Sequence, residues 1–344
     1  MKLLITTQAI DTHHPVLGFF HEWVAELAKH FEHITVICLV EGEHTLPDNV
    51  TVYSLGKEKG ERGRISYARR FLHFLSEIDN EYDAVFVHMN EEYVLIAGWY
   101  WKYHKKPIYM WRNHYAGSFF TGIAVAFCKN VFCTSMRSYT ARYKRTMLMP
   151  VGVDVARFSL NPSAIRAPHS ILFLSRMAPS KRPDMFIDAL GILKSRGVPF
   201  TATLVGSPTP EDQVFYSQLR EHVHVLGLDK MVEFQPSVEH KDAPAAYESH
   251  EIFVNTSRTG MFDKTIFEAA ASGCLVLASS EDFKNATSMA FYFTNAEGLA
   301  DKLQYLLTIN EGKRTEYRVI LDKLVRDNTL PALVGKLVPV VTGG

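Results

Sequence analysis

Short apolar runs alternate with amphipathic stretches along the first half of the chain. Residues 19–31 place Phe20, Trp23 and Val24 on one side at the spacing of a helix. Continuous apolar strands that alternate with helices predict a parallel sheet covered on both faces. The expected strands are 3–6, 34–39, 50–55, 84–88, 108–111, 131–134 and 147–149. The expected helices are 19–31, 64–78, 91–104, 119–128 and 137–143.

The pattern breaks after Pro150, and residues 161–168 are punctuated by prolines. The alternation then restarts, with strands at 171–175, 201–205, 232–234, 252–255 and 274–278 and helices at 183–195, 211–226, 243–249 and 268–272. We therefore predict an α/β fold of two facing, Rossmann-like, doubly wound domains with a ligand cleft between them. The predicted domains are residues 1–160 and 161–327, and a helix at about 328–344 is expected to pack back on the first domain.

The composition is that of an ordinary globular protein, with 47% hydrophobic and 22% charged residues. The formal net charge is zero, so bulk attraction to nucleic acid is not expected. No apolar run reaches the roughly 18 residues that span a bilayer, and the start of the chain reads as a strand rather than a signal peptide. The four cysteines lack metal-binding spacing, which favours buried thiols in a cytoplasmic protein.

An arginine and a lysine follow the first strand of the second domain. Pro183 suits the first turn of a helix, so Arg176 and Lys181 fall in the loop at the carboxyl end of the strand. An arginine fork with a lysine charge suits a diphosphate. A solvated basic loop is the alternative.

A glycine-containing turn joins the strand 252–255 to a helix that ends at Gly273. Gly260 lets the backbone approach a ligand closely, and amides at the start of the helix would face an anion. Glu268 either accepts hydrogen bonds from a ribose diol or forms a capping box with Thr265.

Three residues of the first domain also follow or precede expected elements at ligand-binding positions. His114 closely follows the strand expected at 108–111. It either acts as a hydrogen-bond donor and proton shuttle or has only a structural role. Asn90 follows the strand expected at 84–88, and its role is likewise either functional or structural. Gly18 opens the first helix and either admits a phosphate or sugar or makes a tight turn.

Several familiar motifs are missing from the sequence. Neither G-x-G-x-x-G after the first strand nor a P-loop is present, so no dinucleotide cofactor is expected. Without an Asp-x-Asp pair, a metal-dependent site is disfavoured. A leaving diphosphate would then be neutralised by Arg176, Lys181 and a helix start, at about 1.5–3 kcal/mol for each charge-assisted bond.

Four stretches stand in order along the chain: Pro150-Val-Gly-Val-Asp154 with Arg157-Phe158, Ser175-Arg176 through Lys181, Leu226 through Phe234, and Glu268 through Val276. They resemble the P-x-G-[IV]-D-x-x-x-F, G-R-x-x-x-x-K, L-G-x-x-x-x-V-x-F and E-A-M-A-x-G-x-P-V motifs of the retaining glycosyltransferases of family 4, which have the GT-B fold.

The resemblance implies a metal-independent enzyme that moves a hexosyl-type sugar from a nucleotide-diphosphate sugar, with retention, to a glycan or lipid-linked acceptor in cell-envelope glycoconjugate synthesis. It implies His114, Arg176, Lys181 and Glu268 as catalytic residues. The donor residues would be Gly18, Arg176, Lys181, Gly260, Met261, Phe262, Asp263, Lys264 and Glu268, and the acceptor side would hold Asn90 and His114.

The family usually carries a second glutamate, and Gly260 stands in its place. Asp263 and Lys264 are candidates to substitute for it, or Asp263 is simply a helix N-cap. Two rival functions stay open: a GT-B-fold nucleotide-sugar epimerase, and a non-catalytic nucleotide-sugar-binding homologue.

Basic clusters at 57–70, 99–106 and 137–145 include tryptophan and tyrosine in the first domain. They suit an anionic membrane surface or a lipid-phosphate acceptor, which would place the protein in the cytoplasm at the inner face of the membrane. The alternative is solvated helix faces with a Trp-Tyr stripe packed in the core.

Overall fold

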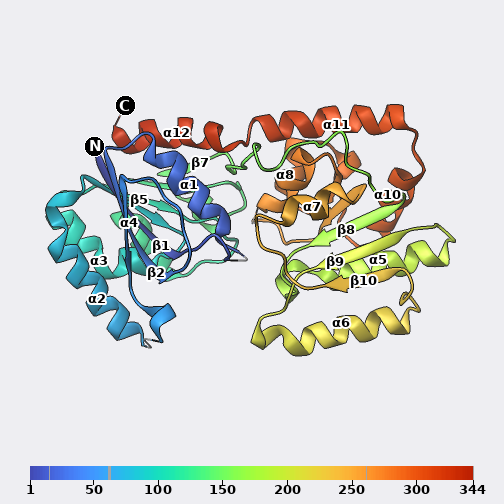
Figure 1. The fold of residues 1–344 in the computed structure, drawn as a ribbon, viewed down its shortest axis with the longest axis horizontal. Helices are drawn as coiled ribbons and strands as arrows, with labels where there is room; N and C mark the ends of the chain where they lie inside the picture. Colours follow the sequence, from blue (N-terminus) through green and yellow to red (C-terminus); the bar gives the residue numbers. More distant parts are fainter. Residues whose placement is uncertain (15, 61–62, 261, 344) are drawn as a thin grey trace. The chain divides into compact units, whose positions relative to one another are not determined.

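Parallel pairing joins the strands of two separate sheets, as the sequence predicts. The computed structural model describes residues 1–14, 16–60, 63–260 and 262–343 (Figure 1). Met1–Gly152 and Leu330–Gly344 form the first unit, and Val153–Thr329 form the second. The chain therefore changes unit at Gly152, earlier than the expected boundary at residue 160.

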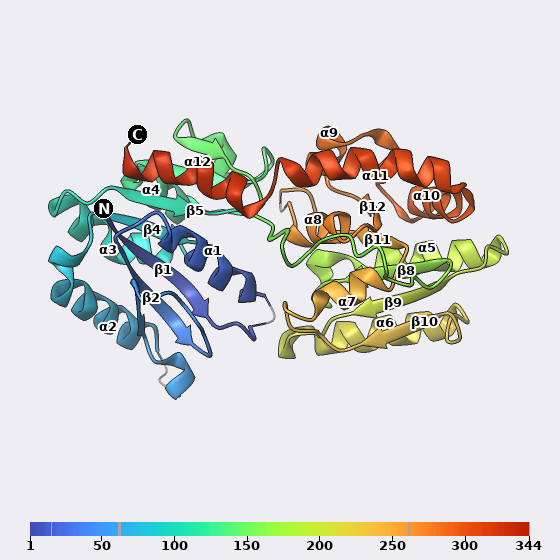
Figure 2. The same ribbon diagram turned by 45° about the horizontal axis from the view of Figure 1, so that its top comes forward.

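The first unit has a seven-stranded sheet in the order β3-β2-β1-β4-β5-β6-β7. Its strands are β1 (Lys2–Ile10), β2 (His33–Glu41), β3 (Val50–Ser54), β4 (Ala84–His88), β5 (Ile108–Trp111), β6 (Asn130–Cys133) and β7 (Thr146–Leu148). Its helices are α1 (Gly18–Ala28), α2 (Arg64–Glu77), α3 (Glu92–Tyr103), α4 (Phe119–Phe127) and α12 (Leu330–Thr342). The helices α1 and α12 cover one face of the sheet, and α2, α3 and α4 cover the other (Figure 2).

The last helix of the chain belongs to the first unit because its apolar side completes that unit's core. Leu333, Leu337 and Val341 recur at helical spacing and are buried. The Lys336 ammonium donates to the Leu148 carbonyl at 2.7 Å, which holds the helix beside β7.

The second unit has a five-stranded sheet in the order β10-β9-β8-β11-β12. Its strands are β8 (Ser170–Leu174), β9 (Thr201–Val205), β10 (Val232–Gln235), β11 (Ile252–Asn255) and β12 (Leu275–Ala278). Its helices are α5 (Pro183–Ser195), α6 (Gln213–Val225), α7 (Ala243–Glu248), α8 (Lys264–Ala271), α9 (Glu281–Ala286), α10 (Ala296–Thr308) and α11 (Glu311–Arg326). Phe186 of α5, Leu219 of α6 and Leu303 of α10 share one core, while α8 packs against α11.

Two local predictions were wrong, and one helix was not predicted. Residues 137–143 form only a short 3-10 turn, Tyr139–Arg142, because the Ser138 and Thr140 hydroxyls bond to the Arg112 carbonyl instead of supporting a helix. The helix α8 begins at Lys264 rather than at residue 268. The short helix α9 was not expected.

The strand order reverses once in each sheet, between β1 and β4 and between β8 and β11. Ligands of open α/β sheets bind outside the carboxyl ends of strands at such a reversal. The loops that follow these four strands are therefore the first places to look for a site.

Gly152 offers a test of how the first unit is held together. Its φ is +74°, and a Cβ there would lie 2.5 Å from Leu333 Cδ2 and 2.9 Å from Trp23 Cζ2. We expect Gly152→Ala to lower the free energy of unfolding by about 2–4 kcal/mol in urea titrations, from backbone strain and overpacking.

The control is Gly335→Ala, because Gly335 lies in α12 and a Cβ there meets nothing within 4 Å. That change should be neutral or stabilise the protein by about 1 kcal/mol through helix propensity. Equal effects of the two substitutions would contradict the packing described for Gly152.

Candidate functional site

Two loops meet at the carboxyl edge of the second sheet: residues 175–182 after β8, called the β8 loop, and residues 256–263 after β11, called the β11 loop. The Thr256 hydroxyl donates to the backbone carbonyls of Lys181 and Arg182, the latter at 2.9 Å. Arg182 adopts a left-handed φ of 53° where the β8 loop enters α5. The Thr256 hydrogen bonds therefore connect the β8 loop to the β11 loop.

An ion pair joins the same loops. Lys181 Nζ lies 2.7 Å from Asp263 Oδ2, and the two side chains are only 17% and 16% exposed. Asn255 Nδ2 at 3.1 Å and the Ser257 hydroxyl donate to the same carboxylate oxygen. Burial alone would raise the pKa of Asp263, but the Lys181 ammonium and these two donors hold that pKa below its ordinary value.

Asp263 is therefore not simply a helix cap. It occupies the N-cap position of α8, yet its side chain makes no capping hydrogen bond. The carboxylate forms the ion pair with Lys181 instead.

Arg176, by contrast, is exposed at the start of the β8 loop. Its guanidinium has no hydrogen bond or ion pair with any residue that the structure describes. The adjacent backbone is fixed by Gly206, where a Cβ would lie 1.9 Å from the Ser175 carbonyl oxygen. Only glycine allows this approach, so the loops after β8 and β9 support one another.

Glu268 lies in α8 and is buried at 4% exposure. Its Oε1 lies 3.2 Å from His240 Nε2, and its Oε2 accepts from the Tyr247 hydroxyl at 3.1 Å. Burial, and then the nearby Glu268 carboxylate, raise the pKa of Tyr247, so its hydroxyl stays protonated and donates. Neither oxygen turns back toward the start of the helix, so the capping-box alternative is wrong.

His240 and Tyr247 were missed by the sequence reasoning. Both precede or lie in α7, and nothing in their spacing points to α8. Phe158 packs edge-on against both rings, with centroids 5.2 and 6.0 Å away, and fixes their orientation around the carboxylate.

The other predicted donor residues are placed as follows. Gly260 adopts a φ of +96°, and Lys264 opens α8. The Phe262 ring is buried and packs on Phe267 with centroids 4.7 Å apart, so its side chain belongs to the packing of α8. Met261 lies outside the described residues.

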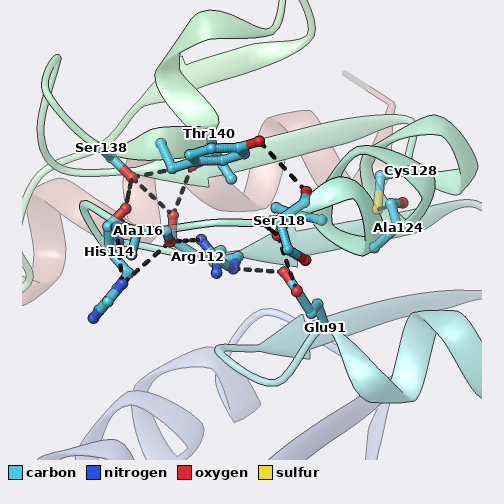
Figure 3. Close-up of polar contacts among 11 residues, drawn as sticks. Glu91, Arg112, His114, Ala116, Ser118, Ala124, Cys128, Ser138 and Thr140 are labelled. Atoms are coloured by element: carbon cyan, nitrogen blue, oxygen red, sulfur yellow. Dashed lines mark hydrogen bonds and ion pairs between the residues drawn. The ribbon is translucent and has the colours of Figure 1, made fainter.

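In the first unit, His114 is exposed in the loop that follows β5 (Figure 3). Its Nδ1 lies 3.0 Å from the Ala116 backbone nitrogen, which can only donate. Nδ1 also lies 3.2 Å from the Ala116 carbonyl oxygen, so the loop occupies this nitrogen and leaves the Nε2 end of the ring pointing outward. Figure 3 shows that end of the ring directed away from the labelled neighbours.

A second ion pair supports the His114 loop. Arg112 Nε lies 2.7 Å from Glu91 Oε2, and Arg112 Nη1 donates to the Ala116 carbonyl at 3.0 Å. The Thr121 hydroxyl donates a hydrogen bond to the other carboxylate oxygen, Glu91 Oε1, at 2.9 Å. His114 thus projects from a braced loop.

Gly18 and Asn90 lie at the reversal between β1 and β4, and their roles stay predictions. The Gly18 amide donates to the His14 carbonyl at 2.9 Å, so it is used within the chain. Asn90 is half-buried and follows Met89, which adopts a φ of 68° that is unusual for a residue other than glycine.

Among residues 1–14, 16–60, 63–260 and 262–343, no group of three histidine, cysteine, aspartate or glutamate side chains is arranged to hold a metal ion.

The family match to known proteins lies within the second unit. Residues 168–308 match the family model described as glycosyl transferases group 1. Mannosylfructose-phosphate synthase of Agrobacterium fabrum is 31% identical over 150 residues, which are 40% of this chain and 33% of that protein. D-inositol 3-phosphate glycosyltransferase of Salinispora tropica is 28% identical over 161 residues, 41% of this chain and 33% of that protein.

The second unit therefore carries a sequence match to the group 1 glycosyl transferases.

Solved structures give the fold over the whole chain. HepE of Anabaena, in complex with UDP-glucose, has a TM-score of 0.81 at 17% identity and covers 100% of both chains. WaaG, a glycosyltransferase involved in lipopolysaccharide biosynthesis, has a TM-score of 0.70 at 14% identity, covering 99% of this chain and 100% of WaaG. The fold is therefore GT-B, as predicted. The sequence matches span only about a third of the first two curated relatives.

The chain departs at Gly260 from the motif that it resembles, in which the first glutamate usually stands. The left-handed φ of +96° is strained for any L side chain. A glutamate placed there would have to adopt this left-handed conformation.

We expect Gly260→Glu to lower the free energy of unfolding by about 1–2 kcal/mol without raising turnover. Urea unfolding and a donor-consumption assay measure the two effects. The matched control is Gly312→Glu at an exposed position in the first turn of α11, where a negative charge is tolerated. A Gly260→Glu variant with full stability and higher turnover would contradict this description of the loop.

Proposed function

We propose that the chain is a metal-independent, retaining glycosyltransferase that moves a hexosyl-type sugar from a nucleotide-diphosphate sugar to a glycan or lipid-linked acceptor in cell-envelope glycoconjugate synthesis. The observation that carries the proposal is an exposed Arg176 in the same loop as Lys181, at the strand-order reversal of the second sheet. The match of residues 168–308 to the group 1 glycosyl transferases and the UDP-glucose complex of HepE support a nucleotide-sugar donor.

The two cations do the work that a metal ion does in other transferases. Arg176 and Lys181 would stabilise the leaving diphosphate, since charge-assisted bonds aimed at developing charge lower a barrier most. Backbone amides of the β11 loop would assist.

Glu268 and His114 would place the other parts of the reaction. The Glu268 carboxylate, oriented by His240 and Tyr247, would accept from the nucleotide ribose. The outward Nε2 of His114 would contact the sugar or its acceptor. Attack on the same face of the sugar, with the leaving phosphate taking the acceptor proton, would give retention.

We expect Arg176→Ala and Lys181→Ala each to lower kcat at least tenfold, equivalent to about 1.4 kcal/mol of transition-state stabilisation. The donor is first identified by thermal shift with UDP, GDP, ADP and their sugars, and turnover is then followed by product analysis.

Lys230→Ala is the control, because Lys230 is exposed just before β10, at the opposite edge of the sheet. Unchanged turnover in both site variants would refute the assignment. Donor binding without transfer or hydrolysis in the wild type would favour the non-catalytic alternative, which the missing glutamate at Gly260 supports.

We also propose that the first unit contacts an anionic membrane through the outer side of α2, α3 and α4, called the α2–α4 face. The Trp-Tyr stripe is divided: Trp101 is buried, whereas Trp99 is 73% exposed. Trp99 packs edge-on against Phe127, so α3 and α4 present one continuous surface. The exposed apolar residues of this face are Ile65, Leu72, Ile96, Trp99, Tyr103, Phe119 and Phe120.

Basic residues accompany this apolar surface, although some of those expected there are used inside the fold. Arg145 donates to backbone carbonyls at the end of α4, and Lys106 donates to the Tyr82 carbonyl. Lys102 lies 5.8 Å from the Trp99 ring centroid and stays exposed, as does Arg69. Aromatic rings among cations suit the interface of an anionic leaflet, which we place at the cytoplasmic side.

No helix in the described parts of the chain is long and apolar enough to cross a bilayer. The proposed contact therefore lies in the plane of the membrane surface.

We expect the double variant Phe119→Ser, Phe120→Ser to lower binding to vesicles of phosphatidylglycerol and phosphatidylcholine at least tenfold in cosedimentation, because burying a phenylalanine contributes about 1.5–3 kcal/mol. Val214→Ser, an exposed apolar change on α6, should leave binding unchanged. Wild-type protein that stays in the supernatant at low salt would end this proposal.

A further inference from the structure

Lys181 already has a carboxylate partner before any ligand arrives. Its ammonium is 2.7 Å from Asp263 Oδ2, and an ammonium has three N–H donors. Only two of these donors remain for a phosphate. Arg176 has no such partner among the described residues, so the two cations are not equivalent.

The carboxylate is held firmly in that position. Asn255 and Ser257 donate to the same oxygen that Lys181 contacts, from the end of β11 and the first turn of its loop. Thr256 ties the backbone of Lys181 to the same loop. Neither member of the pair can withdraw without breaking these bonds.

A diphosphate oxygen bonded to Lys181 would therefore lie close to a negative charge. With about 2.8 Å for a charge-assisted bond, that oxygen would be within about 5.5 Å of Asp263 Oδ2, given the 2.7 Å of the ion pair. This distance is shorter than the roughly 8 Å Debye length at physiological ionic strength, so salt screens the repulsion only in part.

We propose that Asp263 is a built-in counterion of Lys181 that competes with the diphosphate and so limits how tightly the second unit holds a nucleotide diphosphate. The inference rests on the proposed donor site. Its consequence is a faster release of the nucleotide product, because affinity differences of this kind are expressed mainly in the dissociation rate.

Acid does not relieve the competition near neutral pH. The pKa of Asp263 lies below its ordinary value, because Lys181 and the two neutral donors outweigh the effect of burial. The carboxylate thus stays charged down to acidic pH. The pair's contribution to stability is present above the ordinary aspartate pKa and is lost only as the pH falls through the lowered one.

The test measures binding of inorganic pyrophosphate to the full chain by isothermal titration calorimetry. Asp263→Asn keeps the size of the side chain and removes its charge, so we expect the dissociation constant to fall at least tenfold. Asp263→Ser serves as a second uncharged variant if Asn disturbs the fold, which the melting temperature reports.

Two matched variants locate the effect. Asp184→Asn removes the same charge at an exposed position in the first turn of α5 and should leave the dissociation constant unchanged. Adding Lys181→Met to Asp263→Asn should abolish the gain, because the competition acts through that ammonium.

An equal or weaker affinity of folded Asp263→Asn or Asp263→Ser would overturn the proposal and would indicate that Asp263 only positions Lys181. Tighter pyrophosphate binding without any sugar transfer by the wild type would uphold the counterion and refute the transferase. Sugar transfer by the wild type, with no gain in pyrophosphate affinity in the variants, would uphold the transferase and refute the counterion.

Discussion

Burial of parallel strands on both faces is the constraint on which the rest of this structure depends. The faces of both sheets are taken up by helices, so polar chemistry is confined to the loops at the strand ends. Where the strand order reverses, neighbouring loops leave toward opposite faces and open a space between them. Arg176, Lys181 and Asp263 are gathered there from loops that are far apart in the sequence.

Each candidate side chain is oriented by partners of its own. Lys181 is fixed by Asp263, Glu268 by His240 and Tyr247, and the His114 loop by the Arg112–Glu91 pair. Such support reduces the reorganisation needed when charge develops during a reaction. Arg176 lacks it among the described residues, which makes it the adaptable member of the set.

The sequence correctly predicted those elements that are determined by the local order of apolar and polar residues. The strands Ala84–His88 and Ile252–Asn255 match because each begins with a continuous apolar run between polar residues. The helix expected at 137–143 failed because Ser138 and Thr140 bond to a carbonyl from a distant loop. The Lys181–Asp263 and Glu268–Tyr247 contacts depend on which strands are neighbours, and Trp99 and Trp101 differ in exposure because they point to different sides of α3. No local pattern specifies the two contacts between distant loops and helices, or which side of α3 is covered.

The return of α12 to the first unit has a consequence for biosynthesis. Leu333, Leu337 and Val341 complete a core whose other members lie near the start of the chain, such as Phe20 and Trp23. The first unit therefore emerges from the ribosome with an apolar face that stays uncovered until the whole second unit has been translated. The usual order, in which an amino-terminal domain finishes folding first, cannot apply, and the nascent chain needs protection from aggregation during that interval.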